Sequence, residues 1–202
     1  TMLSHRTTHD DEELAYARMI DAFGGWEAVR DAPEDALAEA FRSARFPEAK
    51  ARNVKKALAL ILDARGGAEL DFLAELPPEE GLEWLMRLPG VGLKTASLVL
   101  LFNFGKPLLP VDTHLHRVSS RLGLIHPKTS AEKAHAELLA LLPKDAHVLY
   151  NFHIDMLRHG QRVCVWGRPR CEKCPLTDLC DWYAAHRAPQ PASTGRASEG
   201  KA

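Results

Sequence analysis

All four cysteines of this 202-residue chain lie within seventeen residues near its C-terminus, in the segment CVWGRPRCEKCPLTDLC. Cys164, Cys171, Cys174 and Cys180 follow the spacing C-x6-C-x2-C-x5-C. Four thiolates on one short loop can surround a single metal centre, because each supplies a soft anionic ligand. Disulfide bonds are the competing interpretation, but they suit small secreted domains, and no cysteine precedes Cys164. The pattern therefore predicts a metal centre, and its spacing alone does not choose between zinc and an iron–sulfur cluster.

The composition is typical of a soluble globular protein, with 46% hydrophobic and 26% charged residues. A chain of this length can bury one good core, or two small cores that share an interface. No apolar run approaches the roughly 20 residues that a helix needs to span a bilayer. We therefore expect a soluble, cytoplasmic protein with no membrane partner.

The charges are unevenly distributed, although the net charge is only -1. Residues 10–40 carry ten acidic side chains and two arginines, whereas residues 41–58 carry six Lys or Arg side chains and one glutamate. A second basic stretch, residues 158–173, overlaps the cysteine segment. Such a bipolar layout can hold a polyanion on one face of a nearly neutral protein. Solvated helix faces explain the same pattern, and charge alone does not decide between the two.

Helical patterns run through the whole chain, and no segment shows convincing strand alternation. In the first half of the chain, acidic residues or prolines open the segments, and Gly24 and Gly66 close two of them. We expect helices over residues 10–23, 32–45, 47–65, 77–88, 94–104, 113–122, 130–142 and 146–159. The sequence therefore predicts an all-α fold. The stretch 105–110 is the expected domain boundary, and residues 188–202, which are small, polar and rich in Pro and Gly, predict a disordered tail.

One turn between two predicted helices, LPGVGLKTA, has features of a phosphate-binding site. Gly90 and Gly92 allow a tight turn with positive φ and leave consecutive backbone N–H groups uncovered. At the N-terminus of the following helix, such donors suit a phosphate oxygen. Val91, between the glycines, is expected to anchor the turn in the core. A plain helix–helix turn is the alternative interpretation.

LPGVGLKTA resembles the helix-hairpin-helix of the endonuclease III family of DNA glycosylases. The match continues through VDTHLHRV, residues 111–118, which resembles the family's VDTHxxRV block; its Asp112 follows Lys94 by eighteen residues. The cysteine spacing is similar to that of the family's [4Fe–4S] loop. The three motifs occur in the family's order between Leu88 and Cys180. This resemblance, and not the spacing, favours iron–sulfur over zinc.

The resemblance implies a two-domain helical DNA glycosylase fold. Residues 1–106 would form a six-helix barrel domain that contains the helix-hairpin-helix, and residues 107–187 an iron–sulfur cluster domain. The first domain would be N-terminally short, because the sequence begins at a segment that one or two helices precede in the family. Either the chain is truncated or this member closes its core differently.

Two residues carry the chemistry that the resemblance implies. Lys94 matches the family's nucleophile, an amine that attacks C1′ of a damaged nucleotide, expels the base and forms a Schiff base. Asp112 matches the catalytic aspartate, whose carboxylate would stabilise positive charge on the sugar as the base leaves. A surface lysine and a helix N-cap are the alternative interpretations of these residues.

The resemblance also nominates residues that contact DNA. Phe46 precedes a lysine-containing helix, where the family often has a leucine or phenylalanine wedge that holds the duplex open; a core phenylalanine is the alternative. Arg6 occupies the position of a glutamine in the family's LSxQxTD segment that fills the space left by the flipped base, and His9 replaces the aspartate. In the cluster loop, Arg168, Arg170 and Lys173 are expected to face the DNA backbone. In the hairpin, the expected contacts are Gly90, Val91, Gly92 and Thr95.

The resemblance therefore implies a bacterial, nucleoid-associated monomer that binds damaged double-stranded DNA in base excision repair. We expect a bifunctional glycosylase and abasic-site lyase that removes oxidised pyrimidines by β-elimination. Arg6 and the short N-terminus favour an alternative, a non-catalytic or weakly catalytic DNA-binding paralogue. An adenine mismatch glycosylase is a further alternative, which Lys94 and the short tail disfavour. A zinc-bound protein interaction domain is the third.

Overall fold

The computed structural model describes residues 1–186, which form ten α-helices and three short 3-10 helices and contain no β-strand. The all-α prediction is therefore confirmed for this part of the chain, and the predicted tail, residues 188–202, lies outside it. None of the helices described is both long enough and apolar enough to cross a membrane. The α-helices are α1 (His9–Phe23), α2 (Trp26–Asp31), α3 (Glu34–Ala40), α4 (Pro47–Arg65), α5 (Pro78–Met86), α6 (Leu93–Phe104), α7 (Thr113–Leu122), α8 (Ala131–Ala140), α9 (Ala146–Arg162) and α10 (Asp181–His186). The 3-10 helices are η1 (Asp71–Ala74), η2 (Cys171–Lys173) and η3 (Thr177–Leu179).

Local start and stop signals position most of these helices. Thr8 caps α1 by accepting a hydrogen bond from the backbone N–H of Asp11. Pro47 occupies the first turn of α4, and Gly66, with φ of 73°, ends that helix in the left-handed conformation that glycine adopts most easily. The predicted bounds of α7 are those observed, because Asp112 caps its start and Gly123 ends it.

Two predicted helices differ from the observed ones by three residues or more at one end. The helix expected over residues 32–45 is α3, which ends at Ala40; Phe41 leaves the helical conformation at φ of -87° and ψ of 9° and is fully buried. The short helix α2 was not predicted, because Gly25 both follows one helix and caps the next. The helix α9 continues to Arg162, beyond the expected end at residue 159.

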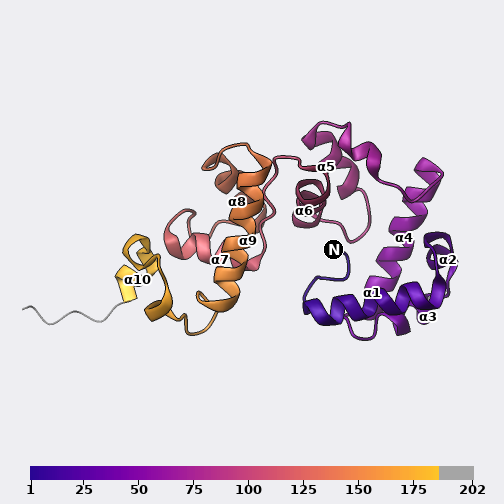
Figure 1. The fold of residues 1–202 in the computed structure, drawn as a ribbon, viewed down its shortest axis with the longest axis horizontal. Coiled ribbons are helices and arrows are strands. Elements are labelled where there is room, and N and C mark those ends of the chain that lie inside the picture. The colour runs from indigo at the N-terminus through magenta and orange to yellow at the C-terminus, as the bar shows by residue number, and fades with distance from the viewer. Residues whose placement is uncertain (187–202) are drawn as a thin grey trace, which may run out of the picture.

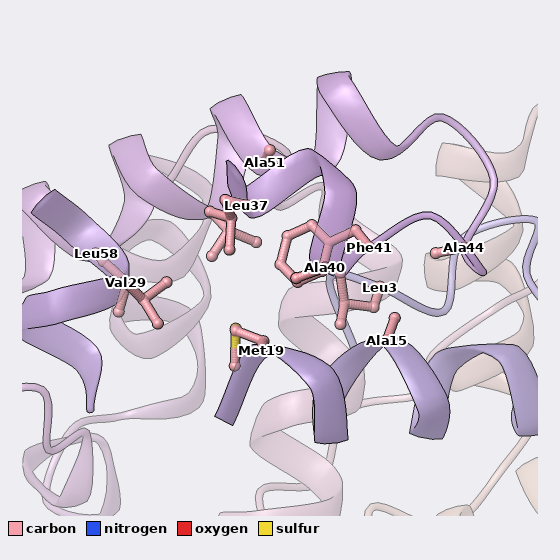
Figure 2. Close-up of a cluster of buried hydrophobic side chains, with 11 residues drawn as sticks. Leu3, Ala15, Met19, Val29, Leu37, Ala40, Phe41, Ala44, Ala51 and Leu58 are labelled. Carbon is pink, nitrogen blue, oxygen red and sulfur yellow. The ribbon is translucent and has the colours of Figure 1, made fainter. Parts of the chain in front are cut away.

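Three clusters of buried hydrophobic side chains hold the fold together, and α6 contributes to two of them. The first joins α1 to α4, and Figure 2 shows its side chains, among them Leu3, Phe41 and Ala44. Leu100 of α6 belongs to the second cluster, with α4 and α5, whereas Leu101 belongs to the third, with α7, α8 and α9. Figure 1 accordingly shows α6 between the group α1–α4 and the group α7–α9. The division into domains at residues 106 and 107 stays a prediction.

Candidate active site

The turn between α5 and α6 is a tight hairpin, and only one of its two glycines has a backbone conformation that favours glycine. Gly90 has φ of 81°, whereas Gly92 is extended, with φ of -99° and ψ of -179°, so the expectation of positive φ holds for Gly90 and is wrong for Gly92. Val91 is half-buried and, as expected, packs against the second hydrophobic cluster, which α4, α5 and α6 form. Together with Thr95 it lines an apolar cavity of about 480 Å³.

The N-terminus of α6 leaves backbone donors free. Gly92 is its N-cap and has no side chain to accept a hydrogen bond. Within residues 1–186, the N–H groups of Leu93, Lys94 and Thr95 have no protein acceptor. Free amides at the positive end of a helix dipole are suited to an anion. Lys94, the second residue of α6, is half-buried at the same place.

Asp112 lies at the start of α7 and is half-buried. Its Oδ1 accepts hydrogen bonds from the backbone N–H groups of His114, at 2.8 Å, and Leu115, at 2.7 Å. Asp112 is therefore the N-cap of α7, as the alternative interpretation expected, but capping uses only one of its two carboxylate oxygens. The other oxygen, Oδ2, has no hydrogen-bond partner among the described residues and is available to contact another group.

His153 of α9 contacts the segment that leads into Asp112, and no local sequence signal marks it. Its side chain is 2% exposed, and its Nδ1 lies 2.9 Å from the carbonyl oxygen of Pro110. Burial lowers the pKa of His153, whereas the bond to Pro110 and the charge of Asp112 raise it and the charge of Lys94 lowers it. Both charged groups therefore influence one imidazole, and the ring of His153 also packs edge-on against Phe102 of α6, with the ring centroids 5.6 Å apart.

A second buried histidine holds the same connecting segment. The Nδ1 of His135, in α8, lies 2.9 Å from the carbonyl oxygen of Leu109, and burial lowers its pKa, with the Leu109 bond acting in the opposite direction. His135 and His153 thus hold the carbonyl groups of Leu109 and Pro110, two consecutive residues that lie only a few positions before Asp112. A neutral imidazole suits each of these buried positions.

Arg6 and Phe46 share an unusual backbone conformation. Their φ angles are 55° and 59°, and within residues 1–186 no other non-glycine residue has a positive φ. Both side chains are exposed, Phe46 to 51%, so the alternative of a core phenylalanine is wrong. Left-handed backbone is costly for residues with a side chain and is concentrated at functional sites.

The four cysteines line one cavity, and none of them forms a disulfide bond, so the disulfide interpretation is wrong. Burial raises the pKa of Cys171, and so do the charges of the other three sulfurs, so the four share one electrostatic environment. Three N–H groups donate to sulfurs: Arg121 Nη1 to Cys164 at 3.2 Å, and the backbone of Leu176 and Tyr183 to Cys174 and Cys180 at 3.4 Å. Such N–H···S bonds are typical of cluster ligands. Among the described residues, no three His, Cys, Asp or Glu side chains form a group tight enough to hold a single metal ion.

The basic residues of the cluster loop, Arg168, Arg170 and Lys173, are all exposed. Arg170 is partly tied to the protein, because its Nη1 donates to the carbonyl of Arg162 at 3.2 Å. Sequence reasoning missed Arg121, whose guanidinium also donates to the carbonyls of Val165 and Trp166, at 2.8 Å each, and thus pins the loop to α7.

Comparison with known proteins agrees with this geometry. The model of the HhH-GPD superfamily base excision DNA repair proteins matches residues 1–144. Endonuclease III of Thermotoga maritima is 33% identical over 91% of this chain and 80% of its own length, and endonuclease III of Rickettsia felis is 30% identical over 90% and 80%. A solved trapped covalent intermediate of endonuclease III with DNA superimposes with a TM-score of 0.79, at 31% identity, over 91% of this chain and 81% of that one. The chain therefore belongs to the endonuclease III family of the HhH-GPD superfamily of base excision DNA repair proteins.

Proposed function

We propose that this chain removes oxidised pyrimidines from duplex DNA and then cleaves the resulting abasic site through a Schiff base on Lys94. Its family establishes the coarser part of this statement, a DNA glycosylase and lyase of base excision repair. The observation that carries the proposal on this chain's own residues is the start of α6, where the half-buried Lys94 lies among three backbone N–H groups that have no protein acceptor within residues 1–186.

In the proposed reaction, the Lys94 amine attacks C1′ and the bond between C1′ and the base breaks. The base leaves with that bond's electron pair, and the nitrogen forms a Schiff base with C1′ after the sugar ring opens. Loss of a proton from C2′ then expels the 3′ phosphate. Oδ2 of Asp112 would stabilise the positive charge that develops on the sugar, while Oδ1 keeps its place at the helix cap.

We assign the DNA contacts to three surfaces. The hairpin would hold a backbone phosphate through the amides that follow Gly92, with Gly90, Val91 and Thr95 shaping the turn. Arg6 and Phe46 would fill the gap that the flipped nucleotide leaves. The exposed Arg168, Arg170 and Lys173 would contact phosphates farther along the duplex.

The cofactor is proposed to be a [4Fe–4S] cluster held by Cys164, Cys171, Cys174 and Cys180. Four thiols that face one cavity and receive N–H donors fit such a group. A bound cluster would tie the two ends of the loop to each other, and the loop carries basic side chains but buries little apolar surface. We assign the cluster a structural role, because the proposed reaction uses no electron transfer.

A second candidate function is a DNA-binding paralogue without efficient chemistry. The observation that favours it is Arg6, whose charge and length differ from the family's glutamine. The adenine mismatch alternative is disfavoured by Lys94, since that branch generally lacks a lysine at this position.

Borohydride reduction of the protein bound to a duplex with one abasic site tests the proposal. We expect a covalent adduct with the wild type and none with Lys94→Ala. The control is Lys106→Ala, which removes a lysine just beyond the other end of α6 and should still form the adduct. An adduct that persists in Lys94→Ala would remove that residue from its role. No adduct with the iron-loaded wild type, together with salt-sensitive duplex binding, would establish the DNA-binding paralogue.

A further inference from the structure

One buried ammonium group holds the two segments that carry Arg6 and Phe46. Lys50, in the first turns of α4, donates from Nζ to the carbonyl of His5 at 3.0 Å, to Oγ1 of Thr7 at 2.7 Å and to the carbonyl of Arg45 at 2.7 Å. These acceptors come from segments about forty positions apart in the chain. The backbone N–H of Arg45 donates to the same Thr7 oxygen at 3.2 Å and joins the two segments a second time.

Burial of a charged lysine at this position costs free energy of desolvation. Lys50 is 7% exposed, and burial lowers its pKa, with the charge of Glu12 acting in the opposite direction. An ammonium has three protons to donate, and here each has a partner, but none of the partners is a carboxylate. Within residues 1–186, no carboxylate lies at ion-pair distance from Lys50, and the more distant charge of Glu12 offsets only part of the desolvation cost. An apolar side chain would therefore be less costly if Lys50 only filled space.

The acceptors have a specific relation to the two left-handed residues. The carbonyl of His5 belongs to the peptide group that leads into Arg6, and the carbonyl of Arg45 belongs to the one that leads into Phe46. Lys50 therefore fixes the orientation of both peptide groups at the points where the backbone enters positive φ. Such conformations persist only where surrounding contacts determine them. Leu3 and Ala44, which lie just before the two segments, are anchored in the same hydrophobic cluster, as Figure 2 shows.

We propose that Lys50 is a positioning residue that presents Arg6 and Phe46 side by side, as one preorganised unit, to the gap in the duplex and to the base left without a partner. This inference rests on the proposed function, because it assumes that the two side chains enter DNA. Two separate loops that must enter one gap lose conformational freedom on binding, and a shared internal clamp reduces that loss in advance.

The test compares Lys50→Met, which keeps the length of the side chain and removes its donors, with Lys55→Met. Lys55 is a matched control on the same helix, because it also donates to a backbone carbonyl, that of Ala32, but contacts neither segment. Both variants lose one positive charge, so the general electrostatic loss of DNA affinity is the same in kind. Thr7→Val and Thr7→Ser form a second pair, since only serine keeps the oxygen that accepts from Lys50 and Arg45.

The readout is the fluorescence of 2-aminopurine placed opposite a stable abasic-site analogue, together with the single-turnover rate on a duplex with one oxidised pyrimidine. We expect Lys50→Met and Thr7→Val to lose most of the fluorescence change that the wild type causes, and to slow base release by about 10- to 100-fold, as misplaced contacts do. Lys55→Met and Thr7→Ser should behave like the wild type in both measurements.

The outcomes separate this inference from the proposed function. A folded Lys50→Met variant with the wild-type fluorescence change and rate would overturn the inference, while borohydride trapping by the wild type would leave the proposed function standing. If Lys50→Met does not fold, Thr7→Val decides: equality with Thr7→Ser overturns the inference, and a defect that serine rescues supports it. A wild type that neither traps abasic DNA nor changes the fluorescence overturns both.

Discussion

Gly90 of the hairpin lies directly against Asn53 of α4: a Cβ added at residue 90 would lie 2.8 Å from Asn53 Nδ2 and 3.0 Å from its Cβ. Asn53 follows Lys50 by three positions, so the same stretch of α4 supports both the hairpin and the segments of Arg6 and Phe46. The proposed phosphate contact and the proposed gap-filling residues therefore share one rigid helix as their base.

This contact predicts that Gly90→Ala destabilises the protein, whereas Gly92→Ala does not. Alanine at residue 90 would have to adopt φ of 81° and displace Asn53, which together cost about 1–3 kcal/mol. Alanine at residue 92 would meet nothing within 4 Å, at an extended φ, so we expect a change below about 0.5 kcal/mol. Urea unfolding measures both. In a double-mutant cycle, Asn53→Ala should recover part of the Gly90→Ala loss, and strict additivity would contradict the contact.

The geometry of Asp112 separates its two roles. Asn is as good an N-cap as Asp, so Asp112→Asn should leave thermal stability nearly unchanged while it slows base release by about 100-fold through loss of the charge. Asp145→Asn is the matched control, since Asp145 caps α9 through its Oδ1 in the same way. Single-turnover kinetics with excess protein measure the rate. An Asp112→Asn rate equal to that of Asp145→Asn would leave Asp112 as a capping residue only.

The buried histidines predict that stability falls in mild acid. Burial lowers the pKa of both His135 and His153 below the ordinary value of 6.5, so between that value and the lowered pKa the unfolded chain binds more protons than the folded one. The free energy of unfolding should therefore be highest above about pH 6.5 and decrease as the pH falls, with a slope of at most about 1.4 kcal/mol per pH unit for each histidine.

The control for this pH dependence is the double variant His135→Asn/His153→Asn. The asparagine amide can replace Nδ1–H at the two carbonyl groups but does not titrate. Chemical unfolding at pH 7.5 and at pH 5.5 should show a smaller difference for the variant than for the wild type. A residual slope is expected from His159, whose pKa burial also lowers. An unchanged slope would show that the two histidines are not the groups responsible.

Removal of one cysteine should unfold the cluster loop without unfolding the rest of the chain. Cys171→Ala should contain little iron and sulfide, become sensitive to proteases between residues 164 and 180, and bind duplex DNA about 10-fold more weakly because the basic side chains lose their fixed positions. Asp178→Asn, an exposed change in the same loop, is the control. Wild-type protein that contains zinc and no iron would show that the metal centre is not an iron–sulfur cluster. A stable and fully active Cys171→Ala variant would contradict the structural role of the cluster.

Much of the helical fold could be predicted because caps, prolines and glycines act over a few residues. The bounds of α7 follow from Asp112 and Gly123, which are adjacent to it in the chain. The prediction was wrong at α3, where burial of Phe41 against α1 and α4 ends the helix earlier than any local signal indicates.

The amino-acid sequence by itself determined the all-α class, the hairpin, the four-cysteine loop and the family, because each depends on residues that are close together in the chain. Only the tertiary structure decided that His153 holds the carbonyl group of Pro110 just before Asp112, and that Lys50 joins the segments of Arg6 and Phe46. These contacts connect residues more than forty positions apart, such as His153 with Pro110 and Lys50 with His5. A lone buried histidine or lysine carries no periodicity and no spacing, and its role exists only in the partners that packing brings to it.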